Sequence, residues 1–167
     1  PDEQRSADAA PCAFSAAAVS PFGDWIVTGG ADETIRLWNY SDLDKPHFSS
    51  CRVNQGIIKA VAYAPDGAWV ASGACDKAVR IWDVTRHAAH GCLKAPKVGR
   101  GHSSYVSAVA YSPDSSKVAS GSYDNTVQLW DARSQTSEKL SATARHGEGH
   151  NQYVTALAFS PDLPIGV

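Results

Sequence analysis

The sequence predicts an all-β fold of four-stranded antiparallel blades, because one short interval occurs three times along the chain. Each interval begins with Asp and ends with Trp six positions later, with apolar and polar residues alternating between them: Asp32–Trp38, Asp76–Trp82 and Asp124–Trp130. The tryptophans lie 44 and 48 residues apart (82 − 38 and 130 − 82). Short alternating strands that repeat at this period are typical of a β-propeller.

The other strands are predicted, in chain order, from apolar runs and turn residues around each interval. An apolar first strand is expected at Phe14–Val19, Ile58–Tyr63, Val106–Tyr111 and Val154–Phe159. Each is followed by a turn containing proline, which presets the backbone angle of a turn: Pro21, Pro65, Pro113 and Pro161. Second strands are expected at Trp25–Thr28, Trp69–Ser72 and Lys117–Ser120. Glycine-containing turns at 29–32, 73–76 and 121–124 then lead into the repeated interval, as in an antiparallel meander. The more polar stretches 39–53, 83–100 and 131–148 should each hold an outer fourth strand.

Two further pairs of residues extend the repeat. Gly101-His102 and Gly149-His150 each place the histidine seven residues before an equivalent apolar residue, Val109 and Leu157. With these features the chain resembles the WD40-repeat family over residues 12 to 162. The resemblance implies a ring of about seven blades, of which this chain holds about three and a half repeats. The expected units are a tail or blade remnant at 1–11, repeats at 12–53, 54–100 and 101–148, and the start of a fourth at 149–167.

The same resemblance implies a structural role for a set of polar and aromatic side chains. In such blades a hydroxyl and an imidazole connect the buried Trp N–H to the turn Asp. The corresponding residues are Thr28, Asp32, Trp38, Ser72, Asp76, Trp82, His102, Ser120, Asp124, Trp130 and His150. Ala10 and Asn54 occupy the histidine position of the first two repeats, so only the third repeat has the full set.

Binding through the top face of the propeller is the function that the resemblance implies. Partners of such propellers often dock around the central channel, where the candidate residues are Ile57, Lys59, Tyr105, Ser107, Tyr123, Tyr153 and Thr155. Tyrosines supply rigid contact area of the kind enriched at interface hot spots. The alternative is that Tyr105 and Tyr153 merely seal the gap between neighbouring blades.

We therefore expect a non-catalytic scaffold that binds other proteins in a multiprotein complex. One alternative is an adaptor that reads a short peptide, for example a basic tail, in the top channel. Another is a propeller domain of a larger enzyme whose catalytic part is absent. The types of His102, Ser120 and Asp124 match a catalytic triad, but the resemblance makes them structural, so no catalytic residue is assigned. No cofactor is expected, and His87, His90 and Cys92 lack an obvious fourth metal ligand.

Composition narrows the partners further. A net charge of −2 supplies no general attraction to nucleic acid or membranes, although the basic linker 86–100 (Arg86, Lys94, Lys97, Arg100) could meet phosphate or an acidic partner. Four cysteines without a CxxC pair suit reduced thiols, which predicts a cytoplasmic or nuclear location. Because about three and a half repeats leave strand edges open, we expect either a piece of a longer chain or two copies sharing one ring.

Overall fold

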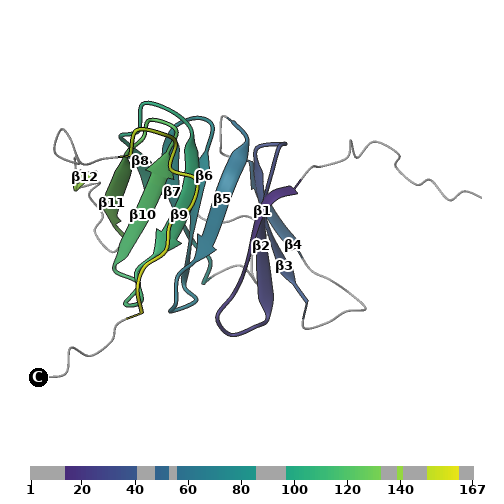
Figure 1. Ribbon diagram of the computed structural model, residues 1–167. Helices are drawn as coiled ribbons and strands as arrows, with labels where there is room; N and C mark the ends of the chain where they lie inside the picture. Colours follow the sequence, from purple (N-terminus) through teal and green to yellow (C-terminus); the bar gives the residue numbers. More distant parts are fainter. Residues whose placement is uncertain are drawn as a thin grey trace, which may run out of the picture.

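The computed structural model describes residues 14–40, 48–52, 56–85, 97–132, 139–140 and 150–161. These residues form three four-stranded antiparallel sheets that stand side by side (Figure 1). The first sheet contains β1 (Phe14–Val19), β2 (Trp25–Gly30), β3 (Thr34–Asn39) and β4 (Phe48–Arg52). The second contains β5 (Ile58–Tyr63), β6 (Trp69–Ala74), β7 (Ala78–Asp83) and β8 (Lys97–Arg100). The third contains β9 (Val106–Tyr111), β10 (Lys117–Ser122), β11 (Val127–Asp131) and β12 (Lys139–Leu140).

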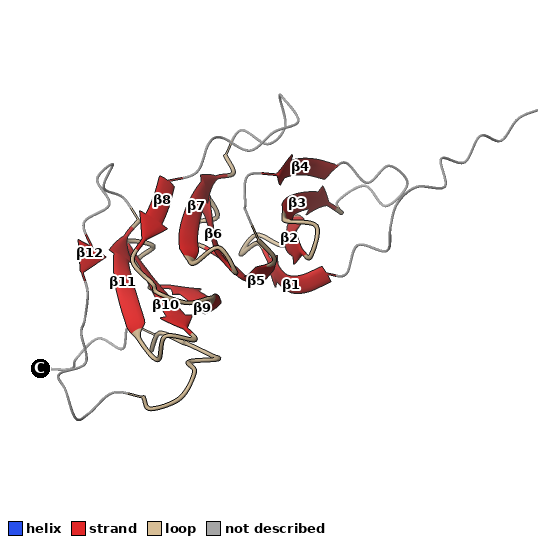
Figure 2. Ribbon diagram, turned by 90° about the horizontal axis from the view of Figure 1, so that it is seen from above, coloured by secondary structure: helices blue, strands red, loops and turns tan. Residues whose placement is uncertain are grey.

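The three sheets are blades of a partial propeller. In each sheet the strands are ordered as they occur in the chain, so every connection is between neighbours. Seen from above, the first strands β1, β5 and β9 lie along one edge of the assembly and the fourth strands lie along the other (Figure 2). This arrangement confirms the predicted all-β blades, including a fourth strand within each of the three polar stretches.

The second strands are longer than predicted, and the expected glycine turns begin later. Gly29, Gly73 and Gly121 belong to β2, β6 and β10 rather than to turns. A Cβ on Gly29 would overlap a methyl carbon of Ile58, and one on Gly73 would lie 2.5 Å from a methyl carbon of Val106. The glycines therefore serve close packing between blades, because the first residue of the next blade's inner strand occupies the space of a side chain.

The hydrophobic core is divided between the blade junctions. One cluster joins Val27, Ile35 and Leu37 of the first blade to Ile58 and Trp82 of the second. The other cluster joins the second blade to the third and includes Val79, Ile81, Val106, Val118 and Trp130. Burial of these side chains removes apolar surface from water and is the main force holding neighbouring blades together.

Residues 154–159 were predicted to form the first strand of a fourth blade, and they are not assigned as a strand. The segment nevertheless docks on the third blade: the Val154 amide donates to the Ser122 carbonyl (3.1 Å), and Val154 is 5% exposed. A Cβ on Gly121 would meet Val154 at 2.5 Å. Val154 thus occupies the position that Ile58 and Val106 occupy at the other two junctions, but no described strand completes a ladder beside it.

The turns between first and second strands also contact one another across blades. Ser115 adopts a positive φ of 60°, at the position where the other two blades have Gly23 and Gly67. Its side-chain oxygen accepts a hydrogen bond from the Asp66 amide of the neighbouring turn at 3.1 Å. The hydroxyl therefore offsets a backbone conformation that glycine would adopt without strain.

We predict that Ser115→Ala lowers the free energy of unfolding by about 1 kcal/mol, because the strain remains and the bond to Asp66 is lost. Ser115→Gly should be closer to neutral, because it loses the bond but relieves the strain. Urea denaturation of both variants measures the difference. A glycine variant that is less stable than the alanine variant would contradict this account.

Candidate functional site

The candidate residues gather on one rim of the blades, which we call the upper rim. It consists of the turns between second and third strands, together with the beginnings of the first strands. The pairing register places them together, since Ile58 at the start of β5 faces Ala74 at the end of β6. The proposed docking residues lie at or just below this rim, and the structural set runs from the turn Asp at the rim to the Trp near the opposite end of the third strand.

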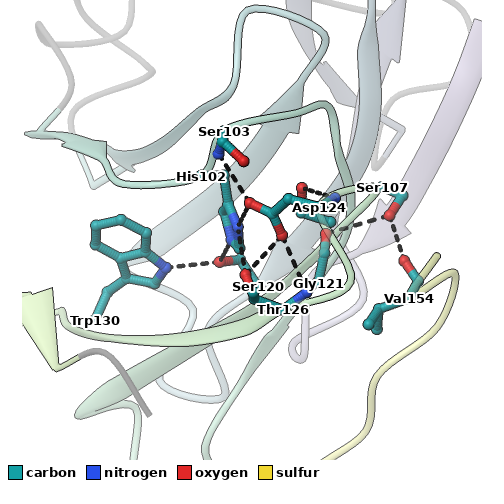
Figure 3. Close-up of polar contacts among 10 residues, drawn as sticks. His102, Ser103, Ser107, Ser120, Gly121, Asp124, Thr126, Trp130 and Val154 are labelled. Carbon is teal, nitrogen blue, oxygen red and sulfur yellow. Dashed lines mark hydrogen bonds and ion pairs between the residues drawn. The ribbon is translucent and has the colours of Figure 1, made fainter. Parts of the chain in front are cut away.

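In the third blade, the set forms one chain of hydrogen bonds (Figure 3). The Trp130 Nε1–H donates to Ser120 Oγ at 2.7 Å, and Ser120 Oγ lies 2.7 Å from His102 Nε2. His102 Nδ1 lies 3.0 Å from Asp124 Oδ2. The Asp124 carboxylate can only accept, so the imidazole carries a proton on Nδ1, and in the neutral imidazole Nε2 accepts from the Ser120 hydroxyl.

Asp124 is the end of this chain and its most heavily bonded member. Its carboxylate accepts hydrogen bonds from the Ser103 amide (2.8 Å), the Thr126 amide (3.0 Å) and the Thr126 hydroxyl (2.6 Å), besides the bond from His102. Burial raises the pKa of Asp124, but the hydrogen bonds from Thr126, Ser103 and His102 outweigh burial and lower the pKa to about 2. The carboxylate is therefore held ionised as an acceptor that joins three segments of the blade.

The triad-like distances among these residues do not make a nucleophilic site. Ser120 is 0% exposed and His102 is 6% exposed, so a substrate carbonyl has no path to the hydroxyl. The Ser120 oxygen also already accepts the Trp130 N–H. The geometry serves cohesion of the blade rather than nucleophilic attack.

The first two blades connect their turn Asp differently. Trp38 Nε1 donates to Thr28 Oγ1, and Trp82 Nε1 donates to Ser72 Oγ, each at 2.9 Å. The turn Asp is bound by an arginine four residues later: Arg36 to Asp32 at 2.5 Å and Arg80 to Asp76 at 2.6 Å. Gln128 stands at the corresponding position of the third blade.

Arg36 and Arg80 were not identified from the sequence, although a signal for them exists. The two repeats without the histidine have Arg four residues after the turn Asp, whereas the repeat with His102 has Gln there. Arg80 is 3% exposed, so its charge is buried together with the carboxylate that neutralises it. Ala10 and Asn54, at the histidine position of these repeats, lie outside the described residues. His150 is described and exposed.

The tyrosines of the candidate face form a continuous row across the third blade and the segment after it. Tyr123 and Tyr153 stack with ring centroids 4.3 Å apart and an interplanar angle of 12°. Tyr105 lies beside Tyr123 at 6.1 Å, and its carbonyl accepts a hydrogen bond from the Tyr123 amide. Tyr105 is 45% exposed and Tyr153 is 58% exposed. The row therefore bridges the blade junction and presents aromatic surface to solvent at the same time.

The second residue of each inner strand differs between junctions. Ser15 donates to the carbonyls of Gly29 and Ile58, and Ser107 donates to those of Gly121 and Val154 (Figure 3). Each serine thereby clips its own blade to the next one. At the junction between the second and third blades this position is Lys59, which is exposed and has no hydroxyl to make the clip. Ile57 is 38% exposed beside it, and Thr155 is exposed after Val154.

Several other candidate residues fall outside what the structure describes. These are His87, His90 and Cys92, and in the basic linker Arg86, Lys94 and the side chain of Lys97. Among the residues that are described, no group of three His, Cys, Asp or Glu side chains is arranged to hold a metal ion. The described residues also contain no helix long and apolar enough to cross a bilayer.

The chain matches one protein family. Residues 9–39, 47–83 and 94–131 match the family described as WD domain, G-beta repeat. Each of the three matched segments ends at the residue after the Trp of its blade, and together they span most of the chain. No curated protein matches the chain significantly.

Proposed function

Because the chain belongs to the WD40-repeat family, whose repeats generally mediate protein–protein interactions, we propose that it is a non-catalytic scaffold in a multiprotein complex. Partner proteins dock on the upper rim in this proposal. One observation carries it: the row of Tyr105, Tyr123 and Tyr153, in which Tyr105 and Tyr153 are exposed and Tyr123 between them is partly buried.

The row has the properties of an interface anchor. Tyrosine combines large apolar area with few rotatable bonds, so little conformational entropy is lost on binding. The stacking of Tyr123 on Tyr153 orders both rings before a partner arrives. A preordered aromatic surface lowers the cost of association, which favours binding at this rim over the mostly buried faces between blades.

The burial of Ser120 and His102 supports the non-catalytic part of the proposal. The proposed cytoplasmic or nuclear location rests on the cysteine pattern, and Cys75, the cysteine whose side chain the structure describes, has a free thiol. Burial raises the pKa of that thiol, more than nearby Lys59 lowers it. A thiol of this kind is a weak nucleophile and suits a structural position.

We predict that replacing Tyr123 with alanine in the intact protein weakens a docked partner by about 30-fold, since removing a desolvated aromatic anchor costs about 2 kcal/mol. Tyr105→Ala and Tyr153→Ala should weaken the same partner. Affinity purification followed by titration of the recovered partner measures the loss, and circular dichroism checks that the blades remain folded.

Phe22→Ala is the matched control, because Phe22 is an aromatic residue 74% exposed in the turn at the opposite rim. This variant should keep the partner. Charge reversal at Lys94 and Lys97 tests the linker as the alternative surface. Partners that survive all three tyrosine changes but are lost on either control change would show that the upper rim is not the docking surface.

A further inference from the structure

Lys59 occupies a position at which the two neighbouring junctions have a serine. At two junctions a serine at this position donates to a carbonyl of the next inner segment, that of Ile58 at the start of β5 or that of Val154. At the junction between the second and third blades the corresponding carbonyl belongs to Val106, and the residue at the serine position is Lys59. Lys59 cannot make the hydrogen bond that a serine would make between the two blades, so this residue lowers the stability of the junction. A residue that lowers stability in this way is a candidate for function.

The side chain of Lys59 leaves its strand next to the tyrosine row. The equivalent side chains of Ser15 and Ser107 reach across to the next inner strand, so this position faces the neighbouring blade. For Lys59 that neighbour is β9, which Tyr105 directly precedes. Lys59 therefore occupies a strand position beside the start of the aromatic row.

Two more cations lie on the same rim of the second blade. Lys77 is in the turn between β6 and β7, and Arg100 ends β8, where it pairs with Ala78 just beyond that turn. All three basic side chains are exposed. They run from the inner strand to the outer strand, so the blade carries a basic strip beside the tyrosines.

The carboxylates on the rim of the second and third blades do not cancel this charge. Asp76 is bound to Arg80 within the second blade, with side chains 10% and 4% exposed. Asp124 is bound by His102, Ser103 and Thr126, with its side chain 8% exposed. These acids are already paired and largely covered, whereas the cations reach solvent, so the accessible field over the second blade is positive.

We propose that the upper rim of the second and third blades is a binding site for an acidic peptide segment that carries an aromatic or proline residue. This inference rests on the proposed function and specifies the chemistry of its partner. The carboxylates of the segment lie along Lys59, Lys77 and Arg100, and its apolar residue packs on Tyr105 and Tyr123. The exposed cations disfavour the basic tail that the sequence alone left open, because like charges at an interface repel.

The test is a selection of short random peptides displayed on phage against the intact protein. Asp and Glu should be enriched next to an aromatic residue or proline among the selected peptides. The affinity of a selected peptide, measured by fluorescence anisotropy, should fall as salt concentration rises. Enrichment of Lys and Arg, selection with no charge preference, or failure to select any peptide would each overturn the proposal.

Lys59→Ser is the informative variant. It should weaken the selected peptide by about two- to fivefold, the usual range for one exposed charge, and Lys59→Glu should weaken it further. The serine should also complete the clip to Val106, so the melting temperature of Lys59→Ser should be unchanged or higher. Lost affinity together with retained stability cannot result from misfolding. Unchanged affinity in both variants would defeat the proposal.

Tyr123→Ala separates this inference from the proposed function. If this variant loses the peptides while the Lys59 variants keep them, docking on the rim stands and the acidic preference is wrong. If neither change affects binding, the peptides bind elsewhere and both proposals fail.

Discussion

Replacing Asp124 with alanine should lower the free energy of unfolding by about 3 kcal/mol, a large fraction of the stability of a domain this size. The change removes the acceptor for His102, Ser103 and Thr126 at once. His102 is buried, so its Nδ1–H would be left without its charged partner. Thermal and urea denaturation measure the loss.

Asp114→Ala is the matched control. Asp114 also accepts hydrogen bonds, from the Ser112 hydroxyl and the Ser116 amide, but it lies in an exposed turn where water can replace the carboxylate. Its removal should cost about 1 kcal/mol or less. Equal losses in the two variants would count against the network as a major source of stability.

The contribution of Asp124 to the free energy of unfolding should decrease as the pH is lowered. Its pKa is about 2 in the folded protein, below the value of about 4 for an unfolded Asp. A depressed pKa stabilises the folded state above the unfolded value, and the benefit is lost as pH falls from about 4 through about 2. The gap in stability between the protein and Asp124→Ala should therefore narrow over this range. A gap that stays constant down to pH of about 2 would contradict the assignment.

Gly73→Ala should destabilise the protein by about 1–3 kcal/mol, although it adds a single methyl group. The new Cβ would lie 2.5 Å from one methyl carbon of Val106 and 3.2 Å from Val109. Val106 is β-branched and 0% exposed, so its side chain cannot turn away, and the two blades would have to separate slightly. Differential scanning calorimetry measures the resulting fall in melting temperature.

Val106→Ala provides the control through a double-mutant cycle. This change alone should be destabilising, because it leaves a cavity at the junction. Combined with Gly73→Ala, it should cost less than the sum of the two single changes, because the new methyl group fills part of the space. Strict additivity would show that Gly73 is not matched to Val106 across the junction.

The sequence by itself determined what happens within a blade. The first strands of the three blades, the proline turns and the spacing of Asp32, Asp76 and Asp124 from the tryptophans could be predicted. The ends of the second strands and the pairing of Arg36 and Arg80 with the turn Asp were missed. The reason is that a hairpin register converts a fixed separation in sequence into a fixed separation in space. Ser120 and Trp130, ten residues apart, are brought together by one strand pair alone.

Only the tertiary structure decided what happens between blades. Three features depend on how two sheets pack. Gly73 leaves space for Val106, Ser115 accepts a hydrogen bond from the neighbouring turn, and Lys59 lies where the other junctions have a serine bond. Sequence spacing does not report such contacts, because residues about 30 to 50 positions apart meet through packing of separate sheets rather than through a shared ladder. The stacking of Tyr123 on Tyr153 follows from the same packing, whereas the two extra cations of the rim are placed by strand pairing within the second blade. The face could be named from the sequence, whereas the chemistry proposed for its partner required the blades to be set side by side.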